Sequence, residues 1–153
     1  MKHKPLKRHK ALQPLSREHH QGLLLSWKIR TGFNKNIEPK RIKAYANWFF
    51  KNYLIPHFEI EETLIFPILE PEHELIKRAL AEHRRLKRLF TETENDTKNL
   101  IKIEEELEQH IRFEERILFP EIQKVATEAQ LLHIENVHQP DSFEDNLVDA
   151  FWN

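Results

Sequence analysis

Hydrophobic residues recur along the chain in steps of three and four, which is the spacing of one face of an α-helix. The periodic stretches predict four long helices, over residues 16–31, 38–70, 72–92 and 97–125. Thr127 can cap a fifth, short helix that ends near His138. Because short polar connections join the long helices, we predict an all-α fold: an antiparallel, up-down four-helix bundle with a short extra C-terminal helix and tail.

Glycine and proline indicate where these helices begin, bend and end. Ser16 can cap the first helix, and Gly32 is placed to terminate it. Pro39 suits the first position of the second helix, whereas Pro56 lies inside that helix and removes a backbone hydrogen bond. The sequence therefore predicts a kink or a break just before His57.

Size and composition are those of one compact helical domain. The chain has 153 residues, of which 39% are hydrophobic and 32% charged, with only two glycines. Straight charged side chains lose little rotamer freedom in a helix, so this composition favours helices. We expect a basic arm over residues 1–14, the bundle over 15–126, and a short helix with an aromatic tail over 127–153.

Charge and cysteine content exclude several classes of function. A formal net charge of -1 gives no electrostatic reason to expect nucleic acid or an anionic membrane as a partner. The absence of cysteine excludes disulfides, zinc–thiolate sites, iron–sulfur ligation and a thiol nucleophile. No apolar stretch approaches the length of a membrane span. We expect a soluble, cytoplasmic protein, either a monomer or a weak dimer.

One motif occurs twice, as HFEIEETLIFP over residues 57–67 and HIRFEERILFP over residues 110–120. The two copies agree in His, Glu, Glu, Phe and Pro. Each copy sets a histidine four residues before a glutamate, which leaves the two side chains about 40° apart around a helix axis. This spacing is suited to a shared metal ligand pair.

The histidines and glutamates of both copies fall on the apolar stripes of their helices. His57 and Glu61 lie on one stripe, His110 and Glu114 on another, and His83 on a third. One such pair alone would be read as an ordinary surface pair. Burying all of these groups would cost several kcal/mol unless they are paired or bind a metal. The pattern therefore favours a metal centre inside the bundle.

The first helix should supply a further imidazole, and it offers two neighbours that point about 100° apart. Helical spacing connects His20 to the apolar positions that follow it and favours His20 slightly. The doublet Glu18-His19, however, mirrors Glu82-His83 and supports His19. Both alternatives remain open from the sequence.

Other polar residues have simpler interpretations. Tyr53 precedes His57 by one turn and could donate a hydrogen bond to a ligand, although packing at the edge of the core is the simpler role. Lys87 could add positive charge near the site or extend outward. We expect the remaining candidate histidines to lie at the surface: His73, His133 and His138.

The order of these motifs resembles the hemerythrin-like, or HHE cation-binding, family over roughly residues 15–125. The resemblance implies a non-haem di-iron centre, with two iron ions (Fe2+/Fe3+) joined by an oxo or hydroxo bridge. Glu62 and Glu115 match the second glutamate of the motif, and we expect them behind the ligands or in salt bridges between helices. The implied ligands are His20 (or His19), His57, Glu61, His83, His110 and Glu114.

Two departures from the oxygen-carrying members of that family affect the expected function. Those proteins have a second histidine on the third helix, where this chain has Lys87, and an aspartate one position after Glu114. Four imidazoles, two bridging carboxylates and an oxo bridge fill about ten of the twelve positions of two octahedral ions. About one position then stays open on each ion, which favours redox reaction or NO binding over simple O2 carriage.

Three hypotheses of function follow from these features. The first is a di-iron protein that binds, senses or scavenges O2 or NO, and it is our preferred interpretation. The second is an enzyme-like role, such as NO or peroxide reduction, ferroxidase action, or iron delivery for the repair of iron centres. The third is a metal-free helical interaction domain. Iron content separates the third from the others, and turnover separates the first two.

Overall fold

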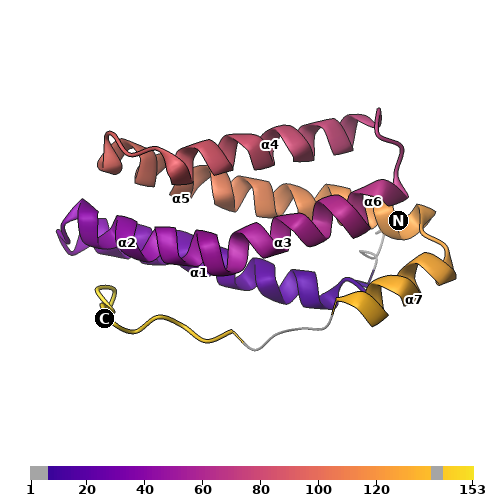
Figure 1. The fold of residues 1–153 in the computed structure, drawn as a ribbon, viewed down its shortest axis with the longest axis horizontal. Helices are drawn as coiled ribbons and strands as arrows, with labels where there is room; N and C mark the ends of the chain where they lie inside the picture. Colours follow the sequence, from indigo (N-terminus) through magenta and orange to yellow (C-terminus); the bar gives the residue numbers. More distant parts are fainter. Residues whose placement is uncertain (1–6, 139–142) are drawn as a thin grey trace, which may run out of the picture.

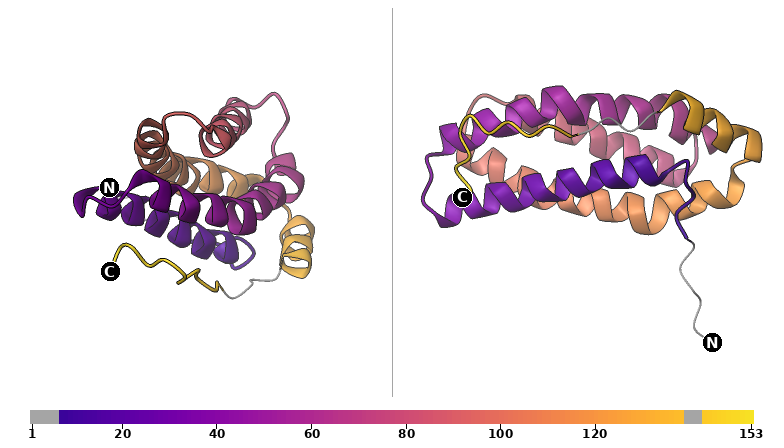
Figure 2. Two further views of the ribbon diagram at one scale, coloured as in Figure 1. Left: turned by 60° about the vertical axis from the view of Figure 1, so that its left-hand side comes forward. Right: turned by 90° about the horizontal axis from the view of Figure 1, so that it is seen from below.

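The computed structural model describes residues 7–138 and 143–153 and is built from helices. Four helical rods lie side by side in alternating directions (Figures 1 and 2), which confirms the predicted all-α four-helix bundle. The short helix α7 (Glu128–Val137) lies across one end of the bundle. The first rod is α1 (Gln13–Asn34), and the second runs from α2 (Pro39–Phe49) to η3 (Phe66–Ile68). The third rod is α4 (Glu74–Thr91), and the fourth runs from α5 (Asp96–Phe113) to α6 (Phe119–Val125).

The second rod continues through Pro56, so of the predicted kink or break before His57 the structure excludes the break. A single π-helical turn, η1 (Phe50–Leu54), comes directly before α3 (Ile55–Ile60), which contains the proline. In this turn the N–H of Ile55 donates to the carbonyl of Phe50, five residues earlier. Because of this wider turn, the helix continues even though Pro56 has no N–H to donate to the preceding turn.

The same device occurs in both copies of the repeated motif. The π-helical turns η2 (Glu61–Ile65) and η4 (Glu114–Leu118) each begin at a glutamate of the motif. A proline follows each turn, Pro67 within η3 and Pro120 within α6. The proline of the motif therefore has a structural role, because its position fixes the widened turn that starts at the buried glutamate.

The boundaries of α1 differ from the prediction. The helix starts at Gln13, ahead of Ser16, and the hydroxyl of Ser16 donates to the carboxylate of Glu115 instead of capping the helix. Gly32 does not terminate the helix but lies buried within it. A Cβ at Gly32 would lie 2.7 Å from Cδ1 of Ile42 and 2.9 Å from Cε1 of Phe151. Gly32 therefore allows α2 and the tail to pack closely against α1.

The last short helix agrees with the prediction. Thr127 caps α7, and its side chain accepts a hydrogen bond from the N–H of Gln130. The side chain of Gln130 in turn accepts from the N–H of Thr127, which completes a capping box.

The core has two hydrophobic clusters that lie on either side of the repeated motifs. On α1, Leu15 belongs to one cluster and Leu25 to the other. On α4, Ile76 and Leu86 are divided in the same way. The polar residues predicted to lie inward occupy the level between these clusters, in the middle of the bundle.

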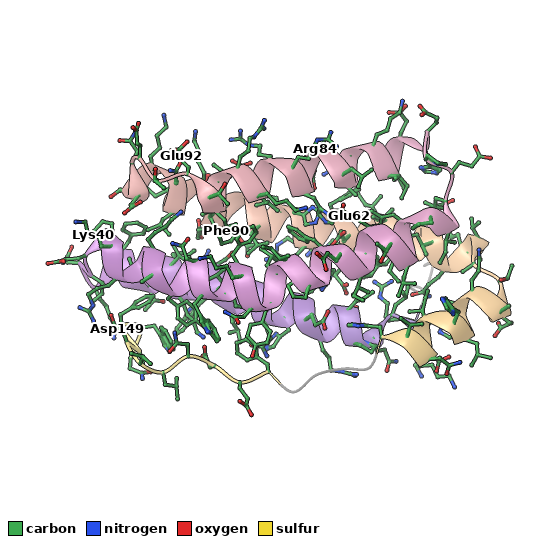
Figure 3. All side chains as sticks on the ribbon, viewed as in Figure 1. Lys40, Glu62, Arg84, Phe90, Glu92 and Asp149 are labelled. Atoms are coloured by element: carbon green, nitrogen blue, oxygen red, sulfur yellow. The ribbon has the colours of Figure 1, made fainter. Side chains whose placement is uncertain are left out.

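The C-terminal tail, residues 143–153, packs along α1 and α2 (Figures 1 and 2). The ammonium of Lys28 donates to Asp145 at 2.6 Å and to the hydroxyl of Tyr45 at 2.7 Å. Asp149 lies against α2 (Figure 3), where it accepts two hydrogen bonds from Arg41. The tail is thus attached by charged contacts as well as by the buried ring of Phe151.

The predicted basic arm over residues 1–14 is described from Lys7 onward, and residues 1–6 lie outside the described residues. Arg8 packs against the fourth rod, where it donates to the carbonyl of Glu115 at 2.6 Å. Across residues 7–138 and 143–153, no helix combines the length and apolar character needed to cross a membrane.

We predict that Gly32→Leu lowers the free energy of unfolding by about 1–3 kcal/mol, because the added side chain overpacks the contact with Ile42 and Phe151. Chemical denaturation followed by circular dichroism measures the change. Thr31→Leu, one residue away and half-buried, is the control and should change stability little. Equal stability of the two variants would contradict the assigned close packing.

Candidate metal centre

Six polar side chains from all four rods meet between the two hydrophobic clusters. Each is nearly inaccessible to solvent, with relative exposures between 0% and 5%. The two glutamates, both fully buried, come from the first positions of η2 and η4. The six residues are His19, His57, Glu61, His83, His110 and Glu114.

The structure places His19 in this cluster and leaves His20 exposed, so the preference for His20 is corrected. The buried face of α1 includes Leu15, His19 and Gly22. A Cβ at Gly22 would lie 2.7 Å from Cδ1 of Ile111, which shows how closely α1 approaches α5. Gly22 lies three residues after His19, so the two residues share the face of α1 that packs against α5, and His19 points into the bundle.

The cluster divides into two groups of four donors. His19 and His57 form one group with both glutamates, and His83 and His110 form the other group with the same two glutamates. Within each group the donor atoms lie within 4.8 Å of one another. Glu61 and Glu114 therefore belong to both groups, an arrangement that suits a binuclear metal site with bridging carboxylates.

The inner atoms of the cluster have few satisfactory partners within the protein. Nε2 of His83 lies 3.1 Å from Oε1 of Glu61, and Nε2 of His110 lies 3.3 Å from Oε1 of Glu114. Despite these short distances, the described residues give no properly aligned hydrogen bond to Nε2 of His57, His83 or His110, nor to either oxygen of Glu61. Buried polar atoms without partners are costly. Metal ions bound by nitrogen and oxygen donors would satisfy them, so the residues fit such a group.

Every histidine of the cluster is held from behind by a carboxylate on a neighbouring element. Because an ionised carboxylate only accepts, Nδ1 must carry the proton in each pair, and Nε2 is the atom left facing the centre. Figure 3 shows Glu62 between the second rod and α4, where it meets His83. The pairs are His57 with Glu18 at 2.8 Å, and, at 2.7 Å each, His83 with Glu62, His110 with Glu82 and His19 with Glu115.

Two of these supporting carboxylates, Glu18 and Glu82, are functional candidates that the sequence analysis did not assign. The signal was present, since both stand directly before a histidine of the cluster. Each contacts a histidine of the next rod instead of its own neighbour: Glu18 contacts His57, and Glu82 contacts His110. Such pairing depends on the order of the rods around the bundle.

The other residues singled out from the sequence lie farther out. Tyr53 hydrogen-bonds the backbone of Glu144 in the tail, so it does not contact a ligand. Lys87 is half-buried, with a side-chain exposure of 44%, and its ammonium lies 3.9 Å from Glu62. His138, which we expected at the surface, is only 11% exposed, and its Nε2 lies 3.2 Å from Oε2 of Glu18.

Burial and charge act in opposite directions on the cluster. Burial alone would lower the pKa of His57, but the facing Glu61 and the hydrogen bond that His57 donates to Glu18 outweigh it and raise that pKa to about 9. The pKa values of His19 and His83 are raised in the same way. Burial would raise the pKa of Glu61, yet the imidazoles hold it at about 2. The metal-free cluster thus binds protons at the positions where cations would bind.

Comparison with known proteins agrees with this geometry. Residues 8–122 match the family described as "Hemerythrin HHE cation binding domain". The chain therefore belongs to this family, whose bundle and cation-binding motifs account for the fold and the buried cluster. No curated protein and no solved structure matches the chain significantly.

We predict that Glu82→Gln lowers metal affinity by roughly 10–100-fold, because the imidazole of His110 loses the carboxylate that orients it. Titration with a competing chelator measures the affinity. Glu74→Gln is the matched control, since Glu74 lies on the same helix with its side chain 89% exposed. An affinity equal to that of the control variant would remove the assigned role of Glu82.

The raised histidine pKa values predict how the metal-free protein responds to pH. A group whose pKa is higher in the folded state stabilises fully below its unfolded value and loses that contribution as pH rises through its folded value. For His57 the pKa is 6.5 in the unfolded state and about 9 in the folded state. The thermal unfolding midpoint of the chelator-treated protein should therefore decrease as the pH is raised from 6.5 to above 9. The midpoint of the metal-loaded protein should decrease less. A midpoint of the metal-free protein that increases over this pH range would contradict the prediction.

Proposed function

We propose that the chain binds two iron ions at this cluster and that the loaded centre binds, senses or scavenges O2 or NO. The observation that carries the proposal is the sharing of Glu61 and Glu114 between two groups of donors. Two carboxylates with an oxygen for each group are suited to hold two cations close together. Both carboxylates are fully buried, and cations would offset the cost of that burial.

The side chains of the chain would hold and orient the metal pair. Each group offers two imidazole nitrogens and carboxylate oxygens, a donor set that suits iron. When bound, ferrous ions would supply the reactivity toward O2 or NO. The outer carboxylates keep the proton on Nδ1, so that Nε2 is free to coordinate.

Aromatic rings shield the cluster from water. The ring of Phe58 stacks on His83 with a centroid distance of 3.8 Å, and the ring of Phe119 stacks on His19 at 5.3 Å. These contacts fix the imidazole planes and limit water at the site. A water-poor site protects a redox-active pair from side reactions.

A second candidate function is reduction of NO or peroxide, and one observation favours it. On α4 the cluster includes His83 alone, and Lys87, one turn further on, is half-buried and lies outside the cluster. If Glu61, Glu114 and the four imidazoles held two iron ions, these six side chains would not fill the coordination shells of both ions, and small ligands could bind. Steady-state consumption of NO or peroxide in the presence of an added electron donor would favour this candidate, whereas stoichiometric binding alone would favour a sensor or carrier.

We predict that the protein, purified without oxygen, contains about two irons per chain and changes its absorption spectrum on exposure to O2, NO or azide. His57→Ala and Glu114→Ala should each lose most of the iron, because each removes an inner donor. Elemental analysis and absorption spectra measure both effects.

His133→Ala is the matched control for these variants, since His133 is exposed on α7. It should load iron like the unaltered protein. Equal loading of all three variants, or an unaltered protein that takes up no iron, would overturn the proposed centre and favour a metal-free interaction domain.

A further inference from the structure

A cavity of about 730 Å³ lies next to the cluster, between α1, the second rod and α5. Its inner end is formed by His57, His110 and Glu114, and its outer end includes the exposed residues Arg17 and Asn52. The cavity therefore extends from the surface of the bundle toward the candidate metal centre, whose side chains are only 0–5% exposed.

The volume of this cavity is far larger than a diatomic ligand needs. A water molecule takes up roughly 30 Å³ in the liquid, and O2 or NO is of similar size. Sites that bind organic molecules have volumes of roughly 300–1,000 Å³. The cavity falls within that range, so gas access alone does not account for it.

The walls of the cavity are apolar, whereas its two ends are polar. Between the ends, aromatic and aliphatic side chains from three rods and the tail form the lining. Such a lining is complementary to a ligand with an apolar body and a polar head. The side chains are Phe49, Leu54, Phe58, Leu107, Ile111 and Phe143.

Part of the outer wall comes from residues after the family match, which ends at residue 122. Phe143 of the tail lies 4.6 Å from the ring of Tyr53, centroid to centroid, and both line the cavity. The hydroxyl of Tyr53 donates to the carbonyl of Glu144 at 3.0 Å, and Asp145 is bound to Lys28. The tail is thus fixed in place as a wall of the cavity.

We propose that this cavity binds an organic carboxylate with an apolar body, and that its head group points toward the His/Glu cluster. The inference rests on the proposed function, because bound iron would make the inner end attractive to an oxygen anion. The apolar body lies along the walls between the cluster and Phe143. The ligand buries apolar surface and places its charge next to the cations.

Decanoate is the probe for this site, and isothermal titration measures its binding to the iron-loaded and the chelator-treated protein. We expect binding to the loaded protein and binding that is weaker by roughly tenfold or more without iron. Decanol, which lacks the anionic head, should bind the loaded protein more weakly than decanoate. Equal binding of decanoate with and without iron would overturn the assigned orientation.

Two variants test the walls. Leu54→Trp narrows the cavity and should weaken decanoate binding by roughly tenfold or more, while the binding of azide, a small anion, stays unchanged. Leu132→Trp is the matched control, because Leu132 is 57% exposed on α7. Phe143→Ala removes the outer wall without altering the bundle, and it should also weaken decanoate binding. If Leu54→Trp does not fold, Phe143→Ala alone tests whether the cavity walls bind decanoate.

Failure of this inference is distinguishable from failure of the proposed function, because the iron content is measured first. A protein that takes up no iron overturns both proposals. A protein that loads iron and binds azide but not decanoate overturns the cavity site alone. Decanoate binding that neither Leu54→Trp nor Phe143→Ala weakens has the same consequence.

Discussion

Two carboxylates at the centre of a hydrophobic bundle are the constraint on which the rest of the site depends. Glu61 and Glu114 are fully buried, and their charge is stable there only if positive or hydrogen-donating groups surround them. Four imidazoles provide that surrounding, and each is held in turn by an outer carboxylate nearer to solvent. Charge therefore alternates from the centre outward: the outer carboxylates stabilise the imidazoles, and the imidazoles stabilise the two buried carboxylates.

The backbone is adapted to the same constraint. Both central glutamates begin a π-helical turn, and a proline follows each turn. A regular helix would offer each carbonyl a bonding partner four residues on, whereas proline removes one such partner and the wider turn rearranges the others. The repeated motif is therefore a unit of chemistry and of backbone geometry together. Pro67 and Pro120 follow the turns that begin at the buried glutamates for the same reason that Pro56 follows a widened turn: the helix must continue without one N–H.

The sequence predicted the bundle and five of the six inner residues, because on three rods the polar positions coincide with a clear apolar stripe. It favoured the wrong neighbour on α1, where Gly22, Ser26 and Gly32 share the inward face with Leu15, Leu25 and Ile29. The small residues allow close approach to α5 but interrupt the hydrophobic period, so the apolar positions that follow His20 gave the stronger signal. The roles of Glu18 and Glu82 were not predictable in the same way, since each supports a histidine on another rod.

The two halves of the centre have similar donors but different surroundings. Glu18 supports His57 and also meets His138, which follows α7 beyond the residues matched by the family. The outer end of the adjoining cavity is likewise lined by Phe143 of the tail. The donor set, which determines what the centre can bind, lies within the family domain. The wall that shapes the approach to one side of the centre lies partly beyond it. A change in the segment after the bundle would therefore alter the approach to the cluster and leave its donor set unchanged.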